Sequence, residues 1–150
     1  MRVDLVWDGC HRAIDDSVIS SVENMLAIQF PLDFVKVIRL CHGGYPTPRR
    51  FSYTDPDLGP IETSLAELLS FDMNYRDNIV NTQRYLAQVL RKGLIAIADD
   101  GGGDYVCMDF GPNRRRRRPK IVYWPHERGS ESSIIVLSDT FTGFLDMLHS

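Results

Sequence analysis

Near the start of the chain, apolar residues recur every three or four positions in two successive segments, the pattern of helices with one buried face. The first segment follows the helix-capping sequence Asp15–Ser17 and ends before Pro31. Pro31 suits the first turn of the second helix, and Gly43 or Gly44 would supply the left-handed residue that ends it. The pattern therefore predicts a helix–proline–helix unit.

The next section predicts shorter elements. After a loop punctuated by prolines, Phe51–Tyr53 has the pattern of a short strand. Ser64 and Glu67 have the spacing of a capping box, which predicts a short third helix. Asn78 is placed to cap a fourth helix, which a cationic last turn and a glycine would end.

Beyond residue 93 the hydrophobic period changes from helical to extended. Four short apolar runs, separated by turn sequences, predict strands at Leu94–Ala98, Tyr105–Phe110, Ile121–Trp124 and Ile134–Leu137. The chain then returns to helical spacing from Phe141 to Leu148, with Ser138 or Asp139 as the cap. The fold class predicted is α+β: a mostly antiparallel sheet meander with helices at both ends packed against it.

Length and composition predict one domain, residues 1–150, with a core from about residue 14 to residue 149. No apolar run is long enough to cross a bilayer, and the first residues lack the features of a signal peptide. Cys10, Cys41 and Cys107 form no CxxC motif. We therefore expect a cytoplasmic protein with reduced cysteines and no membrane contact.

The net charge of −3 conceals an asymmetry. Five of the 17 basic residues are consecutive, and without them the rest of the chain carries −8: Arg114, Arg115, Arg116, Arg117 and Arg118. An acidic body suits a basic partner and argues against general nucleic-acid binding. Like charges repel, so the arginines are expected at the open, solvated tip of a hairpin. An anion-binding patch is the alternative.

The turn after residue 98 gathers carboxylates and glycines: Asp99, Asp100 and Asp104, with Asp109 beyond. Its spacing is not that of an EF-hand loop or a P-loop, so we expect no metal ion and no other cofactor. Two interpretations are favoured: a hairpin turn in which aspartates cap backbone amides, or an acidic surface that binds a protein. A metal site that serves a hydrolase is a further alternative.

Nucleophilic catalysis requires a serine or cysteine held beside a histidine, and no motif of that kind is present. We therefore expect a protein that is not an enzyme. Tyr123 and Trp124 point to opposite faces of their strand, which predicts that one is buried and the other is an exposed anchor. The residues expected to bind a partner are Asp99, Asp100, Asp104, Asp109, Trp124 and His126.

Taken in order, these motifs resemble the SMI1/KNR4 family of the SUKH superfamily. The resemblance runs from about Ile14 onward and rests on Glu23, Phe30–Pro31 with Phe34, the segment 41–44 (CHGG), the segment 97–109 (IADDGGGDYVCMD), the segment 122–126 (VYWPH) and the segment 140–148 (TFTGFLDML). The sequence departs from the family pattern at His42, where asparagine is usual, at Phe30, where leucine is usual, and at Gly143, where an acidic residue is common.

The resemblance implies a bacterial immunity protein that neutralises a toxin by direct binding. With the charge pattern, it predicts a basic toxin domain as the partner. Distant eukaryotic members act as regulatory scaffolds in cell-wall synthesis, so a scaffold is an alternative function. A module that binds nucleic acid or another anion through the arginines is a second alternative, and the sequence leaves a homodimer open.

Overall fold

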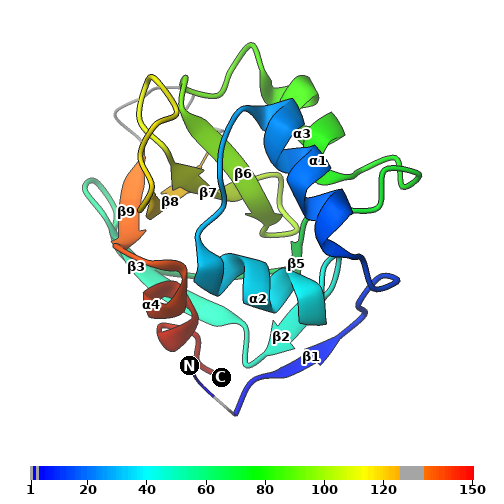
Figure 1. The fold of residues 1–150 in the computed structure, drawn as a ribbon. Helices are drawn as coiled ribbons and strands as arrows, with labels where there is room; N and C mark the ends of the chain where they lie inside the picture. The colour runs from blue at the N-terminus through cyan, green and yellow to red at the C-terminus, as the bar shows by residue number, and fades with distance from the viewer. Residues whose placement is uncertain (1, 3, 126–133) are drawn as a thin grey trace.

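The computed structural model describes residues 2, 4–125 and 134–150. Figure 1 shows helices α1, α2 and α4 in front of the strands, with α3 beside α1. The α+β class predicted from the sequence is confirmed. The beginning and the end of the chain lie together, because the Arg2 guanidinium donates hydrogen bonds to the carbonyls of Leu145 and Leu148.

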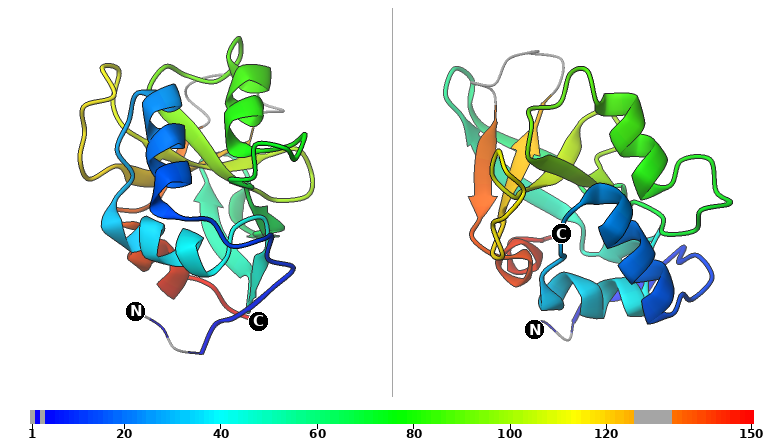
Figure 2. Two further views of the ribbon diagram at one scale, coloured as in Figure 1. Left: turned by 45° about the vertical axis from the view of Figure 1, so that its right-hand side comes forward. Right: turned by 45° about the horizontal axis from the view of Figure 1, so that its top comes forward.

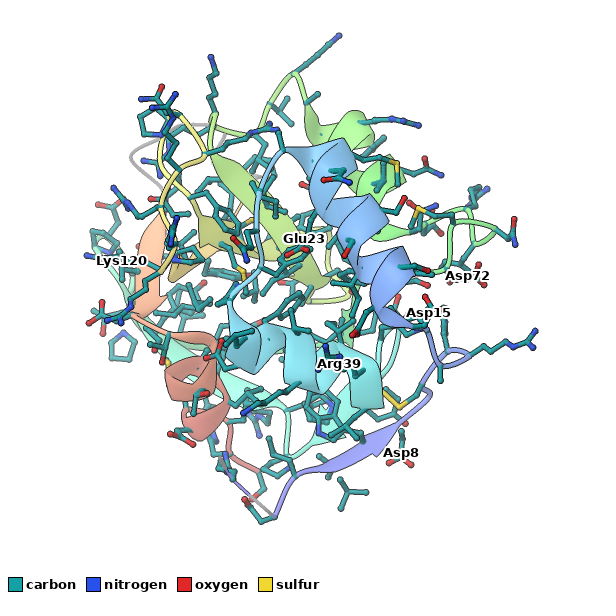
Figure 3. The ribbon with its side chains drawn as sticks, in the orientation of Figure 1. Asp8, Asp15, Glu23, Arg39, Asp72 and Lys120 are labelled. Carbon is teal, nitrogen blue, oxygen red and sulfur yellow. A yellow bond between two sulfur atoms is a disulfide. The ribbon has the colours of Figure 1, made fainter. Side chains whose placement is uncertain are left out.

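The helices of the described residues are α1 (Asp16–Leu26), α2 (Leu32–Leu40), α3 (Ile79–Leu86) and α4 (Phe141–Asp146). Asp15 caps α1 as predicted: its Oδ1 accepts hydrogen bonds from the backbone N–H groups of Ser17 and Val18 (Figure 3). Asn78 caps α3 in the same way, through the N–H of Asn81. These caps are local interactions, which is why the sequence reveals them.

The start of α4 differs from the prediction. Thr140, not Ser138 or Asp139, is the N-cap, because its Oγ1 accepts the N–H of Gly143 at 2.9 Å. Pro31 is the N-cap of α2, one position before the first turn in which the sequence placed it. None of the helices in the described part of the chain has the length and apolar character needed to span a bilayer.

Five strands form an antiparallel sheet whose neighbours follow one another in the chain, so the predicted meander is confirmed. They are β5 (Glu67–Leu68), β6 (Leu94–Asp99), β7 (Tyr105–Asp109), β8 (Lys120–Trp124) and β9 (Ile135–Ser138). Two antiparallel pairs lie outside this sheet: β1 (Val6–Asp8) with β2 (Tyr45–Thr47), and β3 (Arg50–Asp55) with β4 (Gly59–Ser64). Figure 2 shows these strands from two further directions.

The third helix predicted from the Ser64–Glu67 capping box is wrong. Ser64 ends β4, and Glu67 and Leu68 form β5 instead. The backbone N–H of Leu68 donates to the carbonyl of Gly44, and Glu67 lies opposite Asp99 in the sheet. Pairing with distant segments therefore overrides the local capping signal.

Because β5 is short, the backbone groups of β6 that lie beyond it need another hydrogen-bond partner. The Gln83 side chain of α3 supplies it: Nε2 donates to the Ala96 carbonyl at 2.7 Å, and Oε1 accepts the Ala96 N–H at 3.0 Å. This amide satisfies both polar groups of a fully buried backbone position. It also fixes α3 against the sheet.

An aromatic cluster fills the space between the first helices, the sheet and α4. Phe30, Phe34, Phe71, Phe110 and Phe141 are all buried, with neighbouring ring centroids 5.0–6.5 Å apart. The pairs are tilted or edge-to-face, and edge-to-face contacts are favourable beyond the area they bury. The cluster joins the helices at the two ends of the sequence through one core.

The expectation of reduced cysteines is wrong for Cys10 and Cys41, which form a disulfide with their Cα atoms 4.9 Å apart. It links the segment before α1 to the end of α2, across 31 positions of sequence. Cys107 is free and buried in β7. The sequence contains no local signal for the pair, because the fold alone brings the two residues together.

The end of α2 also differs from the prediction. The helix ends at Leu40, and Cys41 follows in an extended conformation (φ −157°), so neither Gly43 nor Gly44 is the C-cap. The absence of a side chain at Gly44 has another reason: a Cβ there would overlap the carbonyl oxygen of Asp8 and the Sγ of Cys41. The N-terminal segment therefore passes directly against this glycine.

Candidate functional site

The turn between β6 and β7 is built by two of its aspartates. Asp100 Oδ1 accepts the N–H groups of Gly102 at 2.8 Å and Asp104 at 3.0 Å. The Tyr123 hydroxyl lies between Asp100 Oδ2 (2.7 Å) and Asp104 Oδ2 (3.1 Å). Burial and this bond raise the pKa of the Tyr123 hydroxyl, which stays a donor. For Asp100 and Asp104 the geometry is that of the capped hairpin turn.

Asp99 is in a different environment. Its Oδ1 accepts the Gly101 N–H at 3.0 Å, and it lies opposite Glu67 in the pairing of β5 with β6. Burial and the neighbouring Glu67 carboxyl raise the pKa of Asp99 to about 6. The two acids thus form a pair in which the charge on one is unfavourable for the other.

This carboxyl pair lies in an open cleft of about 640 Å³ between the glycine turn and the beginning of α3. Tyr85 and Tyr105 line the cleft; Tyr85 is 80% exposed, whereas Tyr105 is half-buried. Asp77 adds a third carboxylate, which has an exposed, loose ion pair with Arg76 (3.6 Å). We call this feature, lined by Glu67, Asp77, Asp99, Tyr85 and Tyr105, the acidic cleft.

Sequence reasoning found one member of the acidic cleft and missed the others. Glu67 was assigned to a capping box, and only the strand register places it opposite Asp99. Tyr85 carried a weak signal, since a tyrosine on the polar face of an amphipathic helix has no core to enter. Tyr105 lies at the start of β7 and stacks on Trp124, with centroids 6.5 Å apart and planes at 24°.

Asp109 does not belong to the acidic turn. It lies at the other end of β7, opposite Leu94, and forms an ion pair with Arg91 (2.7 Å). Arg116 approaches the same carboxylate at 3.8 Å, and Gly111 donates its N–H to it. Hairpin geometry explains the separation, because residues 99 and 109 bound opposite ends of a strand pair.

The predicted exposed aromatic of β8 is also corrected. Tyr123 and Trp124 are both buried, at 2% and 4% exposure, so both faces of the strand are covered here. Trp124 therefore offers no exposed anchor to a partner. His126, which the sequence analysis placed with it, lies outside the described residues.

His42, the departure from the asparagine usual in the family pattern, has a structural role. Its Nδ1 accepts the N–H of Phe71 at 2.9 Å, and its Nε2 donates to the carbonyl of Arg12 at 2.7 Å. Burial lowers the pKa of His42, consistent with the neutral ring that these two bonds require. His42 thus connects the N-terminal segment to the loop after β5.

The structure also contains a serine–histidine pair that no sequence motif indicates. His11 Nδ1 and Ser70 Oγ are 2.8 Å apart, the contact that nucleophilic catalysis uses. Ser70 is only 2% exposed, and its Oγ also accepts the N–H of Asp72, so a substrate has no access to it. No group of three His, Cys, Asp or Glu side chains able to hold a metal ion occurs in the described ranges.

The five arginines lie in the turn between β7 and β8 and are exposed, as predicted. The turn is nevertheless held in place. Arg114 donates to the Leu26 carbonyl at 2.8 Å, and the Arg116 N–H donates to the Phe110 carbonyl. The arginine turn therefore lies against the connection between α1 and α2, which spacing alone did not predict.

Comparison with known proteins agrees with this architecture. No curated protein matches the chain. The model of the SMI1 / KNR4 family (SUKH-1) matches residues 13–147, nearly the whole chain. That range contains the helix–proline–helix unit, the meander and α4, and the resemblance seen in the sequence is confirmed. The chain belongs to the SMI1/KNR4 family (SUKH-1).

Proposed function

We propose that this chain is a non-enzymatic, protein-binding bacterial immunity protein, which neutralises a toxin by direct binding through the acidic cleft. Family membership supports the immunity-like role. The choice of binding site rests on one observation: Asp99 and Glu67 face one another in an open cleft.

A basic partner fits this cleft for an electrostatic reason. Burial and the Glu67 carboxyl disfavour the charged form of Asp99. Among the described residues that line the cleft, the only cationic side chain is the exposed Arg76 at its rim. A lysine or arginine inserted between the two carboxylates would relieve their repulsion and form charge-assisted hydrogen bonds. A basic toxin would therefore neutralise carboxylates that repel one another in the free protein.

The tyrosines of the cleft supply the other requirement of a tight interface. Tyr85 is 80% exposed and stands on α3 beside the carboxylates. Exposed tyrosines next to charged groups are frequent centres of binding energy, because they bury a large area at a low entropic cost. We propose Tyr85 as the exposed aromatic anchor that the sequence analysis had assigned to the strand containing Trp124.

The test is affinity capture from lysate of the source cells at low and high salt. Three forms are compared: the wild type, the isosteric cleft variant Glu67→Gln/Asp99→Asn, and a control that removes two exposed charges elsewhere, Asp8→Asn/Asp146→Asn. We expect the wild type and the control to retain one basic toxin, with retention lost at high salt. The cleft variant should bind the purified toxin at least about tenfold more weakly.

Co-expression separates the function from the site. If cells that express the captured toxin grow only when this chain is also expressed, the chain is the immunity protein. Growth arrest despite co-expression, or capture of no toxin, would refute the function. Equal capture by the cleft variant and the control would place the binding site elsewhere while leaving the function intact.

A further inference from the structure

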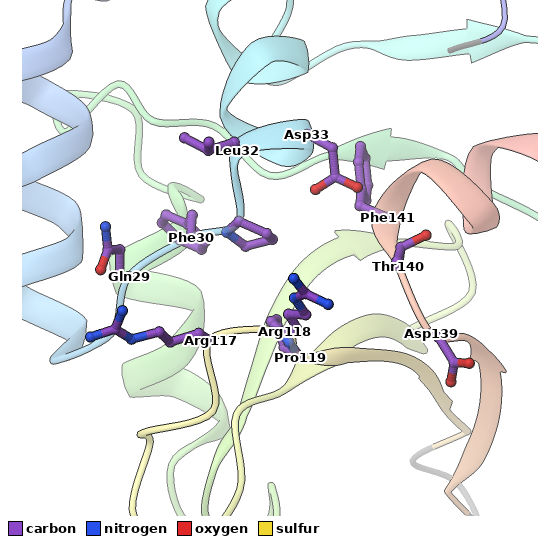
Figure 4. Close-up of a pocket in the computed structure, with 11 residues that line it drawn as sticks. Gln29, Phe30, Leu32, Asp33, Arg117, Arg118, Pro119, Asp139, Thr140 and Phe141 are labelled. Carbon is purple, nitrogen blue, oxygen red and sulfur yellow. The ribbon is translucent and has the colours of Figure 1, made fainter.

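A groove of about 440 Å³ lies where the arginine turn passes the connection between α1 and α2 (Figure 4). Its walls are largely apolar and come from Phe30, Pro31, Pro119 and Phe141. Leu32 stands on its rim with 77% of its surface exposed. The groove is therefore an apolar recess with an apolar lip.

Two arginines border this recess. Arg118 points into it from the turn, and Arg117 extends beside Gln29 (Figure 4). The turn that carries them is fixed, since Arg114 binds the Leu26 carbonyl and Arg116 contacts Asp109. Among the described residues, no hydrogen bond or ion pair engages the guanidinium groups of Arg115, Arg117 and Arg118.

Among the described residues, none of the three nearby carboxylates forms an ion pair with these arginines, and two of them are held by other donors. Glu23 accepts the Phe30 N–H at 2.7 Å (Figure 3). Asp33 accepts both the N–H (2.9 Å) and the hydroxyl (3.0 Å) of Thr142, and so ties α2 to α4. Asp139 alone is exposed on the far side of the groove. The positive charge of the groove is therefore concentrated on the arginine side, and the negative charge lies on the side of Asp33 and Asp139.

We propose that this groove binds an acidic peptide segment of a protein partner, with an apolar side chain of that segment seated against Leu32 and Pro31. Unengaged guanidinium groups pair with carboxylates in a bidentate manner, and the apolar recess accepts the anchor. The groove has a different charge from the acidic cleft and shares no residue with it.

A peptide fits these observations better than a nucleic acid. Single-stranded nucleic acid is held by exposed aromatic faces on which bases stack, whereas Phe30 and Phe141 are 3% and 1% exposed. Outside the arginine run the chain carries −8, which repels a long polyanion. A short acidic segment with an apolar anchor meets the arginines without that long-range cost.

The probe is an acetylated, amidated peptide in which glutamates flank two leucines, titrated into the ¹⁵N-labelled full chain and followed by NMR. Comparison probes are the same peptide with serines in place of leucines and an oligothymidylate of equal charge. Arg117→Ser/Arg118→Ser removes the proposed contacts. Arg12→Ser/Arg84→Ser removes the same charge from exposed positions elsewhere.

We expect amide shift changes confined to residues 29–33, 115–119 and 139–141. Arg117→Ser/Arg118→Ser should raise the dissociation constant for the leucine peptide at least about tenfold. The serine peptide should bind the wild type at least about threefold more weakly than the leucine peptide does. The control variant should bind like the wild type. The proposal is overturned by absent or scattered shifts, by equal weakening in both variants, or by tighter binding of the oligonucleotide. None of these results bears on the acidic cleft.

Discussion

Replacing Asp99 by asparagine is expected to stabilise the folded protein at neutral pH. The structure keeps this carboxylate partly buried and next to Glu67, which raises its pKa from 3.8 to about 6. Asparagine retains the oxygen that accepts the Gly101 N–H and removes the unfavourable charge. A residue that we propose for toxin binding is thus expected to reduce the stability of the free protein, a frequent property of binding sites.

The sign and size of the effect follow from proton linkage. Well below pH 3.8, the pKa of the unfolded chain, the carboxyl is protonated in both states and contributes no difference. As the pH rises to about 6, the unfolded chain loses this proton first, so the wild type loses stability relative to the variant. The shift corresponds to about 3 kcal/mol as an upper bound. Solvent screening of this partly exposed group reduces the expected gain to about 1–2 kcal/mol.

The assay is urea unfolding of wild type and Asp99→Asn at about pH 3 and about pH 7.5, with thermal melts alongside. We expect equal stability at the acidic pH and a melting temperature roughly 2–8 °C higher for the variant at the neutral pH. Asp77→Asn, exposed in the same cleft, is the control and should change stability by less than about 0.5 kcal/mol. A destabilised Asp99→Asn variant, or a gain that is independent of pH, would refute the reasoning.

Three further predictions concern groups that hold the fold together. Tyr123→Phe removes the hydroxyl that joins the two turn aspartates and should cost about 1–2 kcal/mol in urea unfolding, whereas an unchanged midpoint would show that the turn does not need it. Burial lowers the pKa of His42 below 6.5, so the stability that the neutral ring contributes is present above pH 6.5 and should be lost as the pH falls below it. His42→Asn should flatten this pH dependence of stability. An unchanged dependence would show that His42 is not the group responsible. Cys10→Ser/Cys41→Ser should lower stability by roughly 3–4 kcal/mol, with dithiothreitol giving the same loss in the wild type; a reductant-insensitive wild type would argue against the disulfide in solution.

The local chemistry of the sequence determined most of the secondary structure. Asp15 and Asn78 were recognised as caps because a capping side chain bonds to amides two or three residues ahead. The strands from Leu94 to Ser138 were recognised because short apolar runs between turn sequences have few other conformations available. The order of these elements was also sufficient to identify the family.

The candidate site was harder to predict from the sequence, because its residues are distant from one another along the chain. Asp99 was identified from its turn, but its partner Glu67 is 32 positions earlier and belonged to a capping pattern that tertiary pairing overrode. Asp109, grouped with the turn by proximity in sequence, was separated from it by the length of β7. Local periodicity reports which face a residue occupies, but not which other segment covers that face.

The sequence by itself therefore determined the N-caps of α1 and α3, the strands of the meander and the family, because each motif that signals them consists of residues within a few positions of one another. The tertiary structure alone decided that Cys10 bonds to Cys41, that Trp124 is buried, and that the arginine turn lies against residues 26–33. Those outcomes depend on which distant segments the core brings together. That choice is made by packing and pairing over the whole chain, and no short stretch of sequence encodes it.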